Sequence, residues 1–172
     1  MRNVHERVLR ADGQEVAAVL ESLATPADAL WPHDRWPALE LSGGLRPGSA
    51  GGHAEVRYHV AEHVPGRRVV FRFDPGVGIA GTHAFEVLPQ GPSRTLLRHT
   101  LEGRLEGGMR LLWPLVVRWL HDALLEDALD RAQRAVEGSV ARPARWSPWV
   151  RLLHRVETAR ARRAGTPVPS RG

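Results

Sequence analysis

The feature that most constrains the fold is a run of segments in which apolar and polar side chains alternate. These segments span residues 53–64, 67–73, 79–88 and 94–102. A period of two is typical of strands that bury one face, and the short linkers between the segments contain the Gly and Pro residues of tight turns. The sequence therefore predicts an antiparallel meander with one apolar face.

The chain before the meander is expected to form two strands and two short helices. Asp12 and Glu15 have the spacing of a capping box, so a helix should open there and run to about Leu23. Thr25-Pro26 is typical of a second helix start, which Trp31-Pro32 and Trp36-Pro37 would end. Short strands are expected over residues 3–10 and 38–42.

A long helix should follow the sheet, from Gly107-Gly108 to a stop at Gly138. One stripe at helical spacing holds Trp113, Val116, Val117, Leu120, Leu124 and Ala128. The predicted fold class is α+β, with an antiparallel sheet wrapped around a long C-terminal helix.

Composition excludes several kinds of chemistry. The 172 residues suffice for one domain with a proper core. The absence of Cys excludes disulfides and thiolate catalysis, and the absence of Lys excludes Schiff-base chemistry. No cofactor is expected. The N-terminal segment lacks an apolar signal region, so we expect a cytoplasmic protein.

The positive charge is concentrated near the C-terminus. Residues 1–138 hold 16 Arg and 18 acidic residues, whereas 139–172 hold 8 Arg and only Glu157. The predicted domain over 1–138 therefore has no basic surplus, which argues against nucleic-acid binding. Residues 139–172 are predicted to be an Arg-rich extension with a disordered end over 164–172.

The extension should contain an amphipathic helix over 146–163. Its apolar stripe would hold Trp146, Trp149, Val150, Leu153 and Val156, opposite Arg151, Arg155 and Arg162. Such a stripe needs a cover. Two alternatives are open: the helix docks on the protein's own domain, or it contacts an anionic membrane surface or a partner.

Two motifs resemble functional signatures but lack the required context. Gly76-Val77-Gly78-Ile79-Ala80-Gly81 matches G-x-G-x-x-G, but a strand follows where nucleotide binding needs a helix. His59-Val60-Ala61-Glu62-His63 matches H-x-x-E-H. On a strand its two His lie about 13 Å apart, too far to share zinc. No metal site is predicted.

The order of elements resembles the START-like superfamily, also called SRPBCC, which includes polyketide cyclases, dehydrases and lipid carriers. The residues that carry this resemblance lie between 3 and 137: the Asp12–Leu23 helix, Trp31…Trp36-Pro37, the TyrHisVal…ValProGlyArgArgValValPheArgPhe hairpin, His83-Ala84-Phe85-Glu86-Val87…Leu97-Arg98-His99 and Trp113-Pro114…His121-Asp122-Ala123-Leu124. The resemblance implies a helix-grip fold with a cavity between the sheet and the long helix. It implies no common catalytic motif.

The predicted cavity wall comes from the apolar faces of the sheet and the long helix. Its members are Val56, Tyr58, Phe71, Phe85, Leu97, Trp113, Val116 and Leu120. Two polar residues, His83 and His99, interrupt the apolar face. A hairpin turning symmetrically about Gly91 would set them directly opposite each other, with Phe85 opposite Leu97.

The His pair has two interpretations. The side chains either satisfy each other within the core or anchor a ligand and act as acid and base. Asp127 lies within the helix stripe as a possible third catalytic candidate, although a salt bridge to Arg131 is the simpler expectation. His121 is expected at the surface.

The leading functional prediction is binding of a small hydrophobic or amphipathic molecule, as a carrier or sensor without chemistry. Its ligand-binding candidates are Tyr58, Phe71, His83, Phe85, Leu97, His99, Trp113, Val116 and Leu120. One alternative is an enzyme of the cyclase or dehydratase type. Another is an interaction module that uses the 146–163 helix. The oligomeric state is not predicted.

Overall fold

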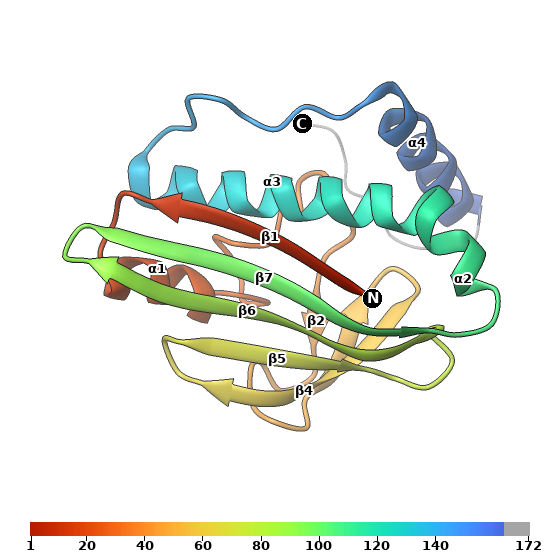
Figure 1. Ribbon diagram of the computed structural model, residues 1–172, viewed down its shortest axis with the longest axis horizontal. Coiled ribbons are helices and arrows are strands. Elements are labelled where there is room, and N and C mark those ends of the chain that lie inside the picture. Colours follow the sequence, from red (N-terminus) through yellow and green to blue (C-terminus); the bar gives the residue numbers. More distant parts are fainter. Residues whose placement is uncertain (164–172) are drawn as a thin grey trace.

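The computed structural model describes residues 1–163, so the predicted disordered end over 164–172 lies outside the described residues. The strands are β1 (Arg2–Leu9), β2 (Glu40–Leu41), β3 (Ala50–His53), β4 (Val56–Val64), β5 (Arg68–Phe73), β6 (Ile79–Gly91) and β7 (Arg94–Leu105). The helical elements are α1 (Gly13–Glu21), α2 (Met109–Leu112), the π-helical turn η1 (Trp113–Val117), α3 (Arg118–Glu137) and α4 (Pro148–Arg163). In Figure 1, α3 lies lengthwise along the sheet.

The strands form one antiparallel sheet in the order β1-β7-β6-β5-β4-β3-β2. The meander predicted over 53–102 is confirmed, and β1 pairs along the outer edge of β7. Alternate side chains of the central strands face α3, where Tyr58, Phe71, Phe85 and Leu97 are almost fully buried. The predicted fold class, an antiparallel sheet around a long C-terminal helix, is confirmed.

Two local predictions were wrong. Residues 25–31 form turns instead of a second short helix, because the buried Asp28 carboxylate accepts hydrogen bonds from the backbone of Ala24, Leu30 and Trp31. These bonds replace the helical pattern. The segment 53–64 is also not one strand: a turn at residues 54–55 divides it into the β3–β4 hairpin.

The helical N-cap and C-cap predictions hold. Asp12 accepts from the backbone of Glu15, and Glu15 accepts from the backbone of Asp12, so the capping box of α1 is complete. The helix α3 ends at Gly138, whose φ of 75° is left-handed and favours glycine.

The long helix differs from the expected regular stripe near its start. The π-helical turn η1 over Trp113–Val117 rotates the residues that follow it, because a π turn accommodates one more residue than an α turn. As a result Val117 packs with Trp113, Ile79 and Leu101. In the predicted regular stripe, both Val116 and Val117 were expected on this face of the helix. Val116 is half-buried, as Val117 is, but it does not pack against this group.

The amphipathic helix predicted over 146–163 is present as α4, which lies beside the start of α3 (Figure 1). Val150 is buried, and Trp149 donates a hydrogen bond to the backbone carbonyl of Leu115 (3.1 Å). The helix therefore docks on the domain, but Trp149 and Val156 of the predicted stripe remain exposed. No helix within residues 1–163 combines the length and hydropathy needed to cross a membrane.

Candidate functional site: a polar cluster inside the apolar core

A group of polar side chains lies between the sheet and α3, inside an otherwise apolar interior. It consists of Tyr58 on β4, His83 on β6, His99 on β7 and His121 on α3. The His99 Nε2 and His83 Nδ1 atoms are 3.3 Å apart and share a hydrogen bond. We call these four residues the interior polar cluster.

Ring contacts hold the cluster in place. The His83 ring stacks on Phe71 at a centroid distance of 4.9 Å and meets the edge of Tyr58 at 4.7 Å. The His99 ring lies 5.4 Å from that of His121, which in turn lies 5.7 Å from Trp113. The cluster thus connects the main apolar core, which contains Phe71 and Phe85, to a smaller apolar group formed by Ile79, Leu101 and Trp113.

The predicted strand register was wrong by two residues, although the predicted face was right. In the β6–β7 ladder His83 lies opposite Leu101, and His99 lies opposite Phe85. The two histidines are therefore diagonal neighbours and not a direct pair. An even shift leaves every side chain on the same face of the sheet, so both still point inward.

Four buried atoms of the cluster lack a hydrogen-bond partner within the described part of the chain. They are Tyr58 Oη, His83 Nε2, His99 Nδ1 and His121 Nδ1. Of these, His121 Nδ1 lies 3.7 Å from Asp122 Oδ1, within ion-pair range but beyond hydrogen-bond distance. Because a buried polar group without a partner costs about 1–3 kcal/mol, these positions call for a polar guest.

Burial keeps these imidazoles neutral. It lowers the pKa of His83 and of His99 well below the ordinary value, and His121 lowers both further by charge repulsion. Burial also lowers the pKa of His121 and that of nearby His53, the latter to about 3. Each neutral ring offers one donor and one acceptor.

Most of the predicted ligand-binding residues meet in this interior. Tyr58, Phe71, Phe85 and Leu97 are completely or almost completely buried, and Trp113 is buried with Ile79 and Leu101. Leu120 is half-buried against the main core. Val116 packs neither against the main core nor against the group around Trp113, because the π-helical turn η1 changes which side chains face the sheet.

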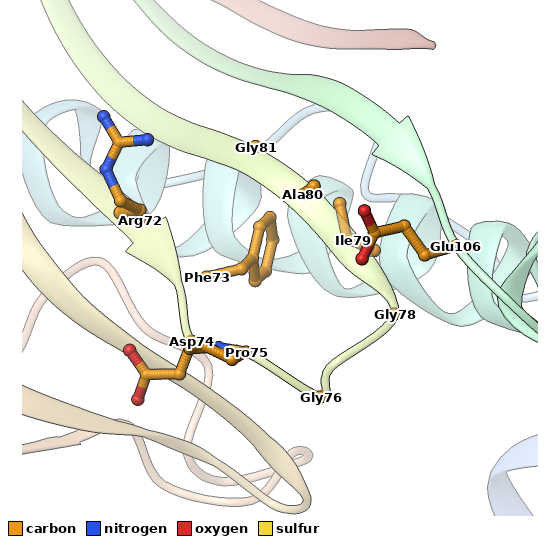
Figure 2. Close-up of a pocket in the computed structure, with 10 residues that line it drawn as sticks. All are labelled: Arg72, Phe73, Asp74, Pro75, Gly76, Gly78, Ile79, Ala80, Gly81 and Glu106. Carbon is orange, nitrogen blue, oxygen red and sulfur yellow. The ribbon is translucent and has the colours of Figure 1, made fainter.

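A surface hollow of about 410 Å³ lies where β5 and β6 separate (Figure 2). Its lining includes Asp74, Gly76 and Gly78 of the β5–β6 turn. The first half of the G-x-G-x-x-G segment is therefore a turn, its second half begins β6, and no helix follows it. Phe73 also lines the hollow, and its ring contacts His83 (5.0 Å) and Tyr58 (6.3 Å). Phe73 therefore separates the hollow from the interior polar cluster.

Two predictions about polar residues of α3 were wrong. Asp127 does not bind Arg131: its carboxylate accepts from Arg35 (2.7 Å), Trp36 (2.8 Å) and Trp146 (2.9 Å). It fastens the loop before β2 and the segment before α4 to the helix. These donors engage both oxygens, and the described contacts of Asp127 include neither His83 nor His99.

His121 was expected at the surface, but its side chain is only 15% exposed and belongs to the cluster. The prediction misplaced His121 because it assumed a regular α-helix from Trp113 onward and so did not include the rotation caused by the π turn. Its position one turn after Val117 and one turn before buried Leu125 is the signal that identifies it.

A row of polar residues continues from the cluster toward β1. The His5 ring lies 6.0 Å from that of His121 and contacts Asp122 (3.1 Å) and Glu126 (2.8 Å). Burial alone lowers the pKa of His5, but hydrogen bonds to these carboxylates outweigh it and raise the pKa to about 9. Sequence analysis missed this group because β1 and α3 are more than 100 residues apart.

The fold is shared by proteins of known structure. Norcoclaurine synthase from Thalictrum flavum, in complex with dopamine and hydroxybenzaldehyde, matches with a TM-score of 0.61 and 14% identity over 83% of this chain and 89% of that chain. CalU16 from Micromonospora echinospora matches at 0.57 and 16% identity, over 91% and 83%. A Thermobifida fusca protein matches at 0.58 and 18% identity, over 78% and 94%.

These matches, with the observed sheet and helix, establish the helix-grip fold that the sequence resemblance implied. No protein-family model matches the sequence, and no curated protein matches it. Identities below one fifth support the fold and leave the activity to be argued from the site.

Proposed function

We propose that this protein binds a small, mostly apolar molecule that carries one or more hydrogen-bonding groups. The molecule would occupy the interior between the sheet and α3. The observation that carries the proposal is the presence of three buried, unpartnered atoms, Tyr58 Oη, His83 Nε2 and His99 Nδ1, on neighbouring rings within an apolar interior. A guest with hydroxyl or carbonyl groups would satisfy these atoms while its apolar body contacts Phe71 and Phe85.

The hollow beside Phe73 supplies a route to this interior. Phe73 is half-buried and touches both the hollow and the His83 ring. Rotation of this one side chain would connect the two, and the adjacent turn contains Gly76 and Gly78 with positive φ values of 93° and 84°. A Phe73→Trp substitution should slow both entry and release of the guest.

Binding is favoured over acid–base catalysis by the state of the histidines. A general base works best with a pKa near the operating pH, whereas burial holds the pKa of His83 and His99 well below that range. Neutral imidazoles that donate and accept hydrogen bonds suit an anchor. The complex of norcoclaurine synthase with dopamine and hydroxybenzaldehyde, two small phenols, supports this proposal because that protein has the same fold.

The test uses hydroxybenzaldehyde as the probe. Its binding is measured by the displacement of the fluorescent apolar dye anilinonaphthalene sulfonate. Tyr58→Phe removes only the unpartnered hydroxyl, so it should weaken probe binding about tenfold while the melting temperature is maintained. Thr95→Val is the matched control, because the Thr95 hydroxyl bonds the backbone of Ala11 away from the cluster. Equal probe affinity in wild type, Tyr58→Phe and His83→Leu would overturn the proposal.

We also propose that the protein contacts anionic membranes through the surface formed by α2, η1, the first turn of α3 and α4. Leu111 is 72% exposed and Leu115 is 61% exposed, and the Trp149–Leu115 hydrogen bond joins these turns to α4. The exposed apolar side chains of this surface are Leu111, Leu112, Leu115, Trp119, Trp149, Leu152 and Val156. Arg110, Arg118, Arg151 and Arg155 are exposed on the same elements. An apolar surface with basic neighbours fits the boundary of an anionic bilayer.

Sedimentation with vesicles tests this second proposal. The protein should pellet with vesicles that contain phosphatidylserine at low salt and be released at high salt. Leu111→Ser/Leu115→Ser should abolish pelleting, whereas Val64→Ser, another exposed apolar residue on the sheet, should not. Pelleting that is unchanged by the double substitution would rule out this surface.

A further inference from the structure

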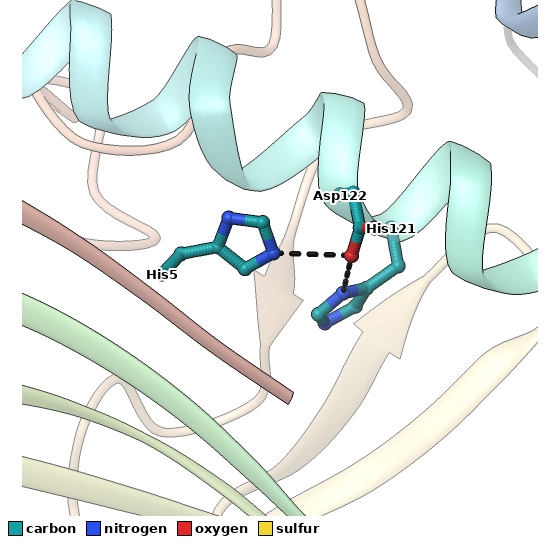
Figure 3. A group of neighbouring side chains, drawn as sticks. All are labelled: His5, His121 and Asp122. Carbon is teal, nitrogen blue, oxygen red and sulfur yellow. Dashed lines mark hydrogen bonds and ion pairs between the residues drawn. The ribbon is translucent and has the colours of Figure 1, made fainter. Parts of the chain in front are cut away.

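Three possible metal-ligating atoms meet between β1 and α3, beside the interior polar cluster, with which this group shares His121 (Figure 3). Asp122 Oδ1 lies 3.1 Å from His5 Nε2 and 3.7 Å from His121 Nδ1. The ligand atoms of the three residues all lie within 4.8 Å of one another. Around a tetrahedral zinc ion with bonds of about 2.0–2.1 Å, neighbouring ligand atoms are about 3.3 Å apart. Small side-chain movements would therefore complete the geometry.

The residues behind these atoms are arranged as the outer partners of metal ligands usually are. His5 Nδ1 donates to Glu126 (2.8 Å), which orients the ring with Nε2 toward Asp122. Asn3 donates to Asp122 Oδ1 (2.9 Å), and Arg7 donates to Glu126 (3.1 Å). Metal-bound histidines generally donate their second N–H to a carboxylate, and metal-bound carboxylates are hydrogen-bonded in turn.

An ion pair alone leaves part of this arrangement unexplained. Contacts of His5 with two carboxylates account for His5, Asp122 and Glu126. They account less well for His121, whose buried Nδ1 lies 3.7 Å from Asp122 Oδ1, within ion-pair range but beyond hydrogen-bond distance. A cation at the centre of the three would give Nδ1 a partner at bonding distance.

We propose that His5, His121 and Asp122 bind a divalent transition-metal ion, with Zn²⁺ as the representative ion. Two imidazoles and one carboxylate suit zinc and related ions and are poor ligands for Mg²⁺. The three side chains are 12%, 15% and 29% exposed, so the group lies close to the surface although His121 Nδ1 itself is buried. Three protein ligands leave one coordination position open for water or another small ligand.

Zinc titration of the tag-free, chelator-treated protein tests the site. Calorimetry should show one Zn²⁺ per chain and no Mg²⁺, and Zn²⁺ should raise the melting temperature. His121→Phe keeps the ring contacts but removes the ligand atom, so it should weaken Zn²⁺ binding at least 100-fold. Glu126→Gln should weaken it about 10–100-fold through the orientation of His5.

His59→Phe is the matched control, because His59 contacts Asp74 at 2.8 Å in a comparable His–Asp pair on the other side of the sheet. Its Zn²⁺ affinity should equal that of the wild type. Co²⁺ in the wild type gives a readout that needs no variant, since three protein ligands should produce the strong visible absorption of tetrahedral Co²⁺. Absence of Zn²⁺ binding, or binding that is unchanged in His121→Phe, would overturn the proposal.

Discussion

His99 Nε2 lies 3.3 Å from His83 Nδ1, although the two residues are diagonal and not opposite in the β6–β7 ladder. This hydrogen bond joins two side chains that are each less than 10% exposed. It uses one nitrogen of each ring and leaves the other nitrogen without a partner in the described part of the chain. The pair is therefore half satisfied, and its energetics can be measured by substitution.

Substitution of the two histidines should be strongly non-additive. His83→Leu or His99→Leu alone leaves the remaining imidazole with no partner and should lower the free energy of unfolding by about 1–3 kcal/mol. The double substitution removes both buried polar groups, so its cost should be smaller than the sum of the two. Urea denaturation of the four proteins measures the coupling. Additive effects would show that the hydrogen bond contributes nothing to stability.

Two buried hydroxyl groups should respond differently to removal. Tyr58→Phe deletes an unpartnered group and should leave the free energy of unfolding unchanged or raise it. Thr95→Val deletes a hydroxyl that donates to the backbone of Ala11 (3.1 Å) and should lower it by about 1 kcal/mol. Thermal denaturation of both variants checks the difference. A large loss in Tyr58→Phe would mean that its hydroxyl already has a partner.

Acid should destabilise the protein below about pH 6.5, the ordinary histidine pKa. Burial lowers the pKa of His53 to about 3 and lowers that of His83 and His99, so these rings stay neutral in the folded chain but gain protons on unfolding. Their contribution to the free energy of unfolding is fully present above pH 6.5. It is lost as the pH falls toward the pKa values that these histidines have in the folded chain. For each histidine that gains a proton only on unfolding, the free energy of unfolding falls by about 1.4 kcal/mol per pH unit.

A denaturation series from pH 6.5 to 4.5, with a chelator present, measures this slope. The His83→Leu/His99→Leu variant is the control and should show a flatter profile, because two of the responsible groups are gone. The series does not extend above pH 6.5 because the pKa of His5 is raised to about 9. The stability that His5 contributes is lost as the pH rises from 6.5 to about 9, which is a separate effect. Equal slopes in both proteins would contradict the assignment.

The C-terminal segment should stabilise the domain through Trp146 more than through Trp149. Trp146 donates to the buried carboxylate of Asp127 (2.9 Å), so Trp146→Phe should lower the free energy of unfolding by about 1–3 kcal/mol. Trp149 is 44% exposed and donates to a backbone carbonyl, so Trp149→Phe should cost less than about 0.5 kcal/mol. Urea denaturation compares them. Equal costs would contradict the role of Asp127 as the anchor.

Local sequence patterns were sufficient to predict most of the elements. Alternation identified the meander, the Asp12–Glu15 spacing identified the capped helix, and Gly138 marked the end of α3. They failed where a side chain overrode the local pattern, as Asp28 does in the turns after α1. They also failed at the π turn, because one extra residue changes the direction of every later side chain.

The inward direction of His83 and His99 was also predictable, because side chains alternate along a strand whatever its register. Their diagonal contact was not, since the register depends on the geometry of the turn at residues 91–94. The sequence by itself thus determined the meander, the long helix and which faces are apolar. Only the tertiary structure decided that His5 meets Asp122 and His121, and that Asp127 binds Trp36 and Trp146, because such contacts join segments whose separation in sequence carries no local signal.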